Sequence, residues 1–167
     1  MPDNISQKNR ISIKQWSWIT LLVIVLDQIT KLLADHYLQY HQAVELVPMF
    51  NLTLMYNKGA AFSFLAQAGG WQRWFFLILT SVVSLFIFLW IRKLKPQQKL
   101  QASALALILG GAIGNLIDRA IYGHVIDFLD IYYQQHHWPA FNIADSAISV
   151  GAFLLIYDTL KNTDEDN

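Results

Sequence analysis

Four long apolar runs divide the chain, and shorter polar segments separate them. The runs cover approximately residues 16–34, 71–91, 100–118 and 141–160. Each has roughly twenty residues, and at about 1.5 Å per residue a helix of that length crosses the ~30 Å hydrocarbon core of a bilayer. The pattern predicts an integral membrane protein, mainly α-helical, with four transmembrane helices.

The connections between the runs differ in character. Val44–Tyr56 alternates imperfectly between apolar and polar positions, is rich in strand formers and ends at the turn sequence Asn57-Lys58-Gly59. This predicts a small β-element at the membrane surface between spans one and two. Between spans three and four, over residues 119–140, we expect a loop or a short helix.

The two ends of the chain are polar. Residues 1–15 show no periodic apolar face and residues 161–167 are acidic, so we expect two cytoplasmic tails around a single membrane-embedded domain, residues 16–160. The first run contains Asp27 and Lys31 and lacks a small-x-small cleavage site after it. We therefore expect an uncleaved first span and not a secretory signal peptide.

Composition agrees with a membrane protein and removes several function classes. Apolar residues make up 54% of the 167 residues and charged residues only 14%, whereas soluble domains carry about 25% charged residues. The net charge is zero, so no basic surplus favours a nucleic-acid partner. The absence of cysteine excludes disulfides, thiolate nucleophiles and cysteine-based metal sites.

Lysine and arginine are distributed unequally between the two sides of the membrane. The segment before span one has three and the loop Arg92–Lys99 has four, whereas the two opposite connections hold mainly Lys58, Arg73 and Arg119 over far more residues. By the positive-inside rule both termini are cytoplasmic. Spans one and three then end on the outer side, and spans two and four begin there.

This topology brings polar residues from distant parts of the sequence to the outer ends of the spans. They are Asp27, Lys31, Asn57, Asn115, Asp118, Arg119, Asp127, Asn142 and Asp145. Charges this close to lipid are expensive to keep, so their convergence indicates a functional site.

The same residues fall in five short blocks. The blocks are Asp27-Gln28-x-Thr30-Lys31, Asn57-x-Gly59-Ala60-Ala61-Phe62, Gly110-Gly111-x-x-Gly114-Asn115-x-x-Asp118-Arg119, Val125-x-Asp127-Phe128 and Phe141-Asn142-x-Ala144-Asp145. In order and spacing they resemble the signature blocks of the bacterial lipoprotein signal peptidase (signal peptidase II) family. The resemblance covers about residues 16–160.

The resemblance implies an aspartyl endopeptidase in the bacterial inner membrane with its active site at the periplasmic face. Such enzymes cleave diacylglyceryl-modified prolipoproteins just before the lipidated cysteine, without a cofactor or metal. It implies that Asp127 and Asp145 are catalytic. It further implies that Asn57, Gly111, Asn115, Arg119 and Asn142 bind substrate or support the pair, and that Asp27, Lys31 and Asp118 are structural. The expected partners are prolipoproteins and membrane lipids, and we expect a monomer.

The residues alone leave the pairing of the acids open. Two carboxyls held close in a poorly hydrated place share one proton, as an aspartic peptidase requires. Asp118, Asp127 and Asp130 are all candidates to pair with Asp145, and only the family motif selects Asp127. We expect Asp130 to be a solvated loop acid. Arg119 should anchor either the Asp118 carboxylate or a substrate carbonyl.

Each polar feature also has a structural interpretation. Asn142 and Asp145 resemble a helix N-cap and an acid in the first helical turn. Asp27 and Lys31 have the i,i+4 spacing of a helix-stabilising ion pair. Three glycines, Gly110, Gly111 and Gly114, suit close helix packing. Three histidines, His124, His136 and His137, have no metal-ligand spacing and are expected in interfacial loops.

Two other function classes fit less well. A Ser–Lys peptidase would need Lys31 or Lys58 with Ser63 or Ser146, but the chain has no nucleophile motif for it. An ion or proton conductor should carry its charges near the midplane of the membrane, whereas here they gather at one edge.

Overall fold

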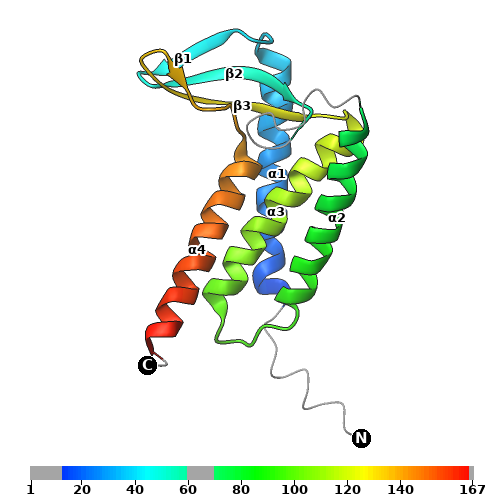
Figure 1. Cartoon of the computed structure of the whole chain (residues 1–167), viewed down its shortest axis with the longest axis vertical. Coiled ribbons are helices and arrows are strands. Elements are labelled where there is room, and N and C mark those ends of the chain that lie inside the picture. Colours follow the sequence, from blue (N-terminus) through cyan, green and yellow to red (C-terminus); the bar gives the residue numbers. More distant parts are fainter. Residues whose placement is uncertain (1–12, 60–69, 166–167) are drawn as a thin grey trace, which may run out of the picture.

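The computed structural model describes residues 13–59 and 70–165. In this part of the chain four helices run side by side, and a small antiparallel sheet lies across one end of them (Figure 1). The elements are α1 (Ile13–Tyr37), β1 (Ala43–Val47), β2 (Phe50–Asn57), α2 (Trp71–Ile91), α3 (Lys99–Ile121), β3 (Val125–Tyr133), β4 (His136–His137) and α4 (Ile143–Glu165).

All four helices are long and apolar enough to cross a membrane. Large apolar side chains on their outer faces are exposed, for example Trp74, Ile78 and Phe86 on α2. Exposed side chains of this kind suit a lipid environment, because lipid tails are as apolar as the side chains themselves. The predicted integral membrane fold with four spanning helices is confirmed.

Helix α3 is the centre of the bundle, since it packs against α1, α2 and α4. Its small residues make this close packing possible. A Cβ on Gly110 would lie 2.8 Å from Cβ of Val23, and one on Gly111 would collide with the Ala144 carbonyl oxygen. A Cβ on Gly114 would strike the Asp27 carboxylate. The expectation that these glycines serve helix packing is therefore supported.

The sheet joins two connections that are distant in the sequence. Its strand order is β1-β2-β3-β4, and β2 and β3 pair so that Met55 lies opposite Asp127 and Asn57 opposite Val125. The β-element expected between spans one and two is confirmed as β1 and β2. The loop or short helix expected over residues 119–140 is wrong, because Val125–Tyr133 of that segment forms β3 and His136–His137 forms β4, and these strands complete the sheet.

Three of the four helices extend beyond the predicted spans, and α2 coincides with its predicted span. Helix α1 begins at Ile13 and α4 continues to Glu165, so part of each predicted tail is helical; the rest of those tails lies outside the described residues. Polar helix-forming residues can continue a helix past its apolar run. Helix α3 reaches Ile121, and Arg73 donates to its terminal carbonyls of Arg119 and Ala120.

The start of α1 and the end of α4 lie at the end of the bundle opposite the sheet (Figure 1). The short connection between α2 and α3 lies at that end too. The sheet therefore lies at the other end of the bundle, and buried polar residues such as Asp118 and Asp127 lie near it.

Candidate active site

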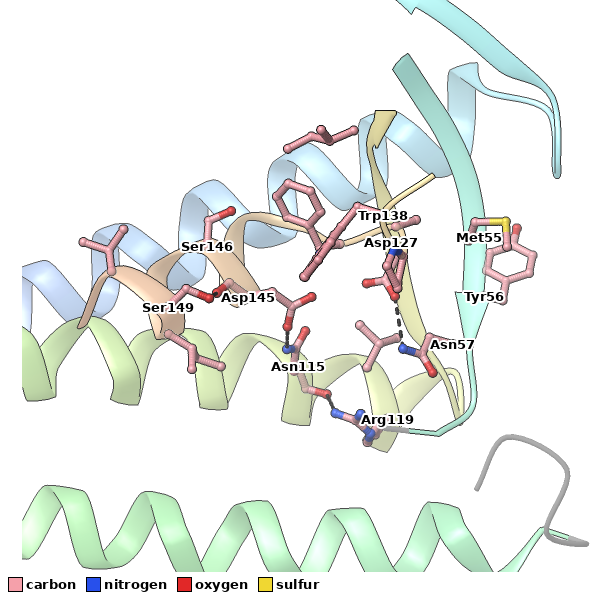
Figure 2. A pocket seen from close by; sticks show the side chains of 17 residues that line it. Met55, Tyr56, Asn57, Asn115, Arg119, Asp127, Trp138, Asp145, Ser146 and Ser149 are labelled. Atoms are coloured by element: carbon pink, nitrogen blue, oxygen red, sulfur yellow. Dashed lines mark hydrogen bonds between the residues drawn. The ribbon is translucent and has the colours of Figure 1, made fainter. Parts of the chain in front are cut away.

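A cavity of about 840 Å³ lies between α3, the first turns of α4 and the paired strands β2 and β3 (Figure 2). Asp127 and Asp145 both line it, as do Asn57, Asn115 and Arg119. Most of its remaining lining is apolar. Four elements thus form the cavity around the predicted carboxyls, and one of them, β2, is distant from the others in the sequence.

Asp127 projects from β3 and is 2% exposed. Its Oδ1 accepts a hydrogen bond of 2.7 Å from Nδ2 of Asn142, and its Oδ2 accepts one of 3.2 Å from Nδ2 of Asn57. Burial raises the pKa of Asp127 to about 7, and the nearby Asp145 carboxylate adds to this rise. The hydrogen bonds from the two asparagines and the charge of Lys31 oppose the rise in pKa.

Asp145 lies in the first turn of α4. Its Oδ1 accepts a hydrogen bond of 2.8 Å from Nδ2 of Asn115 (Figure 2). Its backbone N–H donates to Oδ1 of Asn142 at 2.9 Å, which is the hydrogen bond of a helix N-cap. Asn142 is completely buried, and it contacts both predicted catalytic acids.

This arrangement suits a pair of carboxyls that shares one proton. When the charge of one acid raises the pKa of the other, the two protons leave in separate steps and the pair titrates as a unit. Between those steps one carboxylate can accept a proton from water while the protonated partner polarises a carbonyl group. That is the chemistry of an aspartic peptidase.

A cluster of buried ions lies beside the cavity. Lys31 is 1% exposed, and its Nζ lies 2.8 Å from Oδ2 of Asp27 and 2.8 Å from Oδ2 of Asp118. The i,i+4 ion pair between Asp27 and Lys31 is confirmed. Asp27 also accepts the backbone N–H of Ala144 at 2.9 Å, so the cluster ties α1 to both α3 and α4.

Arg119 does not bind Asp118, although the two are neighbours in the sequence. Its guanidinium donates to the carbonyl of Gly59 at 2.9 Å and lies 5.2 Å from the centre of the Phe76 ring. Successive residues on a helix point in different directions, so Asp118 faces Lys31 on α1 while Arg119 faces α2 and the end of β2. The prediction that Arg119 anchors the Asp118 carboxylate is therefore wrong.

Asp130 is buried at 5% exposure, so its expected position in a solvated loop is wrong. Asn51 and Thr53 on β2 donate to its Oδ2 at 3.3 and 3.1 Å, and Nδ1 of His137 lies 2.9 Å from its Oδ1. Asp130 does not line the cavity. Its contacts hold the outer part of the sheet together.

Two of the four groups that a Ser–Lys peptidase would use, Lys31 and Ser146, are engaged elsewhere. The Lys31 ammonium is bound by two carboxylates, and Oγ of Ser146 donates to the Asn142 carbonyl at 2.9 Å. Lys58 is exposed, and Ser63 lies outside the described residues. Within those residues no group of three or more metal-binding side chains comes together.

Sequence reasoning gave no role to Trp138 and Phe141, yet both line the cavity beside Asp145. Trp138 is 60% exposed, which places a large apolar ring at an accessible edge. Its position just before Pro139 and the Phe141-Asn142 block was the available signal.

Comparison with known proteins places the chain among membrane-embedded peptidases. A sequence model of the family described as signal peptidase (SPase) II matches residues 19–161. The chain therefore belongs to the signal peptidase II family, and it is a peptidase of that type.

Individual relatives agree along nearly the whole chain. A protein named lipoprotein signal peptidase from Teredinibacter turnerae is 52% identical over 155 residues, which are 93% of this chain and 92% of the relative. One of the same name from Cupriavidus pinatubonensis is 56% identical over 146 residues, 87% of this chain and 82% of the relative. A bacterial membrane enzyme solved at 2.3 Å resolution has a similar fold, with a TM-score of 0.84, 30% identity and 96% coverage of each chain.

Proposed function

We propose that the protein removes the signal peptide from prolipoproteins that carry a diacylglyceryl group, with Asp127 and Asp145 as the catalytic pair. Cleavage would occur just before the lipidated cysteine. The observation that carries this proposal is the position of both carboxyls in one cavity, where each accepts an asparagine N–H. The relatives named lipoprotein signal peptidase support the substrate class.

In this mechanism no covalent bond forms between enzyme and substrate. The ionised carboxylate takes a proton from a water molecule, whose oxygen attacks the scissile carbonyl carbon, and the protonated partner stabilises the carbonyl oxygen. The C–N bond then breaks and a proton passes to the leaving amine. Asn57, Asn115 and Asn142 hold the two carboxyls in place through their N–H groups.

The shape of the cavity supports a substrate that arrives from the bilayer. Its lining follows α4 beyond Asp145 to Ser149 and Val150, which lie on the spanning part of the helix. Met55 and Trp138 give it an apolar wall near the membrane surface. A lipid-anchored peptide can reach such a site without leaving the membrane.

We place this site at the periplasmic face of the bacterial inner membrane, with both termini in the cytoplasm and one chain forming the complete cavity as a monomer. The support is the excess of lysine and arginine at the opposite end. Reporter fusions after Lys99 and after Lys161 should report the cytoplasm, and one near Gln134 should report the outside. The opposite result at Gln134 would overturn this orientation.

The experiment that tests the proposed function uses the purified protein in detergent and two matched prolipoproteins, one diacylglyceryl-modified and one unmodified. We expect cleavage before the cysteine of the modified substrate and little cleavage of the unmodified one. A folded protein that cleaves neither substrate would contradict the proposal. Equal cleavage of both would overturn its requirement for lipid.

A further inference from the structure

The buried ammonium of Lys31 makes one contact that charge alone does not explain. Two of its contacts are the ion pairs with Asp27 and Asp118, each at 2.8 Å. The third is a hydrogen bond of 2.9 Å to Oδ1 of Asn115. An ammonium group has three N–H donors, so after the two carboxylates one donor remains, and the Asn115 amide oxygen accepts it.

We propose that Lys31 is a positioning residue of the reaction, because it fixes which end of the Asn115 amide faces Asp145. An ammonium group can only donate hydrogen bonds, so the amide must turn its oxygen toward Lys31. Its Nδ2 then faces Asp145 and donates to Oδ1 at 2.8 Å. Reversing the amide would place N–H against the ammonium and oxygen against the carboxyl, which leaves buried polar groups unpaired.

The other two asparagines that contact the carboxyl pair, Asn57 and Asn142, are oriented in the same way, but by backbone groups. Oδ1 of Asn142 accepts the N–H of Asp145, and Oδ1 of Asn57 accepts the N–H of Gly59, both at 2.9 Å. Each therefore turns its Nδ2 toward Asp127, at 2.7 and 3.2 Å. All three amides present hydrogen-bond donors to the carboxyl pair.

The amide oxygen of Asn115 is held by another side chain and not by a backbone group, because Asn115 lies inside α3. Backbone N–H groups inside a helix already donate to carbonyls one turn away, so none is left to hold its amide oxygen. Nδ2 of Asn142 also donates to that oxygen, at 3.2 Å, because its amide has two hydrogens and the other one binds Asp127. The shorter hydrogen bond to the Asn115 oxygen, 2.9 Å, comes from Lys31 on the neighbouring helix α1.

The result is an uneven pattern of hydrogen bonds around the pair. Both oxygens of Asp127 and Oδ1 of Asp145 accept an amide hydrogen. From residues 13–59 and 70–165, Oδ2 of Asp145 receives none. Oriented amides thus occupy three of the four carboxyl oxygens and leave Oδ2 of Asp145 for the reacting groups.

This proposal rests on the proposed function, because it gives Lys31 a role only if Asp145 takes part in catalysis. Its test is the variant Lys31→Met with Asp118→Asn, which removes the donor and one carboxylate together. In the wild type this cluster contains two carboxylates and one ammonium, and in the double variant it contains only the Asp27 carboxylate. Its net charge is therefore the same in both proteins. Asp118→Asn alone is the matched control, since it keeps Lys31 beside Asn115.

We expect the double variant to lose about tenfold or more in kcat with little change in KM, because substrate binding is untouched and only the carboxyl pair is disturbed. The control should keep kcat within about threefold. Wild-type kcat in a folded double variant would overturn the proposal. A double variant that does not fold would overturn it as well, by making Lys31 a residue of the fold and not of the reaction.

A double-mutant cycle separates positioning from a general structural role. In an Asn115→Ala background, the same double substitution should change kcat by less than about twofold, because residues that act through one another are not additive. Equal losses in both backgrounds would contradict the proposal. Asp145→Asn in the same assay distinguishes a failure of the proposed function from a failure of the Lys31 proposal. Wild-type turnover in Asp145→Asn would reject the proposed function. If Asp145→Asn is inactive, a negative result with the Lys31 variants contradicts only the role of Lys31.

Discussion

Asn142 donates a hydrogen bond of 2.7 Å from its side-chain amide to Asp127 on β3. The same side chain caps α4, because its Oδ1 accepts the backbone N–H of Asp145. Helix capping and support of the carboxyl pair, which the sequence offered as alternatives, are thus combined in one residue. The start of α4 and the position of Asp127 cannot change independently.

The raised pKa of Asp127 predicts a loss of activity in alkaline solution. Burial and the charge of Asp145 raise this pKa to about 7, so the shared proton is lost above that pH. Cleavage by the wild type should fall by about tenfold per pH unit above the transition. The measurement is kcat in detergent between pH 5 and about 9, and a rate that stays level to the upper end would contradict the prediction.

The same pKa has a consequence for stability that does not depend on activity. In the unfolded protein Asp127 releases its proton near its ordinary pKa of 3.8, whereas in the folded protein its pKa is about 7. The stability that this group provides is therefore complete below the lower value and is lost as the pH rises to the upper one. The melting temperature of Asp127→Asn, relative to that of the wild type, should therefore rise as the pH increases through that interval and should not change outside it. A constant difference across it would exclude the raised pKa.

Arg119→Lys tests the role of the buried guanidinium. A lysine cannot bind the Gly59 carbonyl and cover the Phe76 ring with one planar group. We expect the free energy of unfolding to fall by about 1–2 kcal/mol, together with a lower cleavage rate. Arg73→Lys is the matched control, because Arg73 binds carbonyls at the end of α3 and does not line the cavity. Equal effects at both positions would make Arg119 an ordinary interfacial charge.

Asp130→Asn separates stability from catalysis. Asp130 accepts hydrogen bonds from Asn51 and Thr53 and contacts His137, so the substitution should lower the free energy of unfolding by about 1–2 kcal/mol. Because Asp130 does not line the cavity, kcat should stay near the wild-type value. Thermal melting and cleavage measured on one preparation check this. An inactive variant with an unchanged melting temperature would refute it.

The sequence predicted the four spans and the polar end of the molecule well, because run length and charge distribution are local properties. It did not predict β3. Asp127 and Asp130 are three residues apart, which is also a helical spacing, and the strand is buried along most of its length, so it lacks a clear alternation. Its identity depends on pairing with β2, which lies about seventy residues earlier in the chain.

The partners of individual charged residues also could not be predicted from the sequence. Nothing in the sequence shows that Asp118 faces Lys31, about ninety residues away, while its neighbour Arg119 faces Gly59. The burial of Asp130 likewise depends on residues of two other strands, β2 and β4. The family motif selected Asp127 and Asp145 as catalytic, and those roles stay predictions until they are measured.

The most direct test of the central claim is kcat for a diacylglyceryl-modified prolipoprotein with Asp127→Asn, Asp145→Asn and the double variant, each shown to be folded. Asparagine is nearly isosteric with aspartate and can still form hydrogen bonds, but it cannot share the proton. We predict that either single substitution lowers kcat by about 10²–10⁴-fold and that the double variant is hardly slower than the singles, because the two carboxyls act as one unit. Near-wild-type turnover in either single variant would contradict the account.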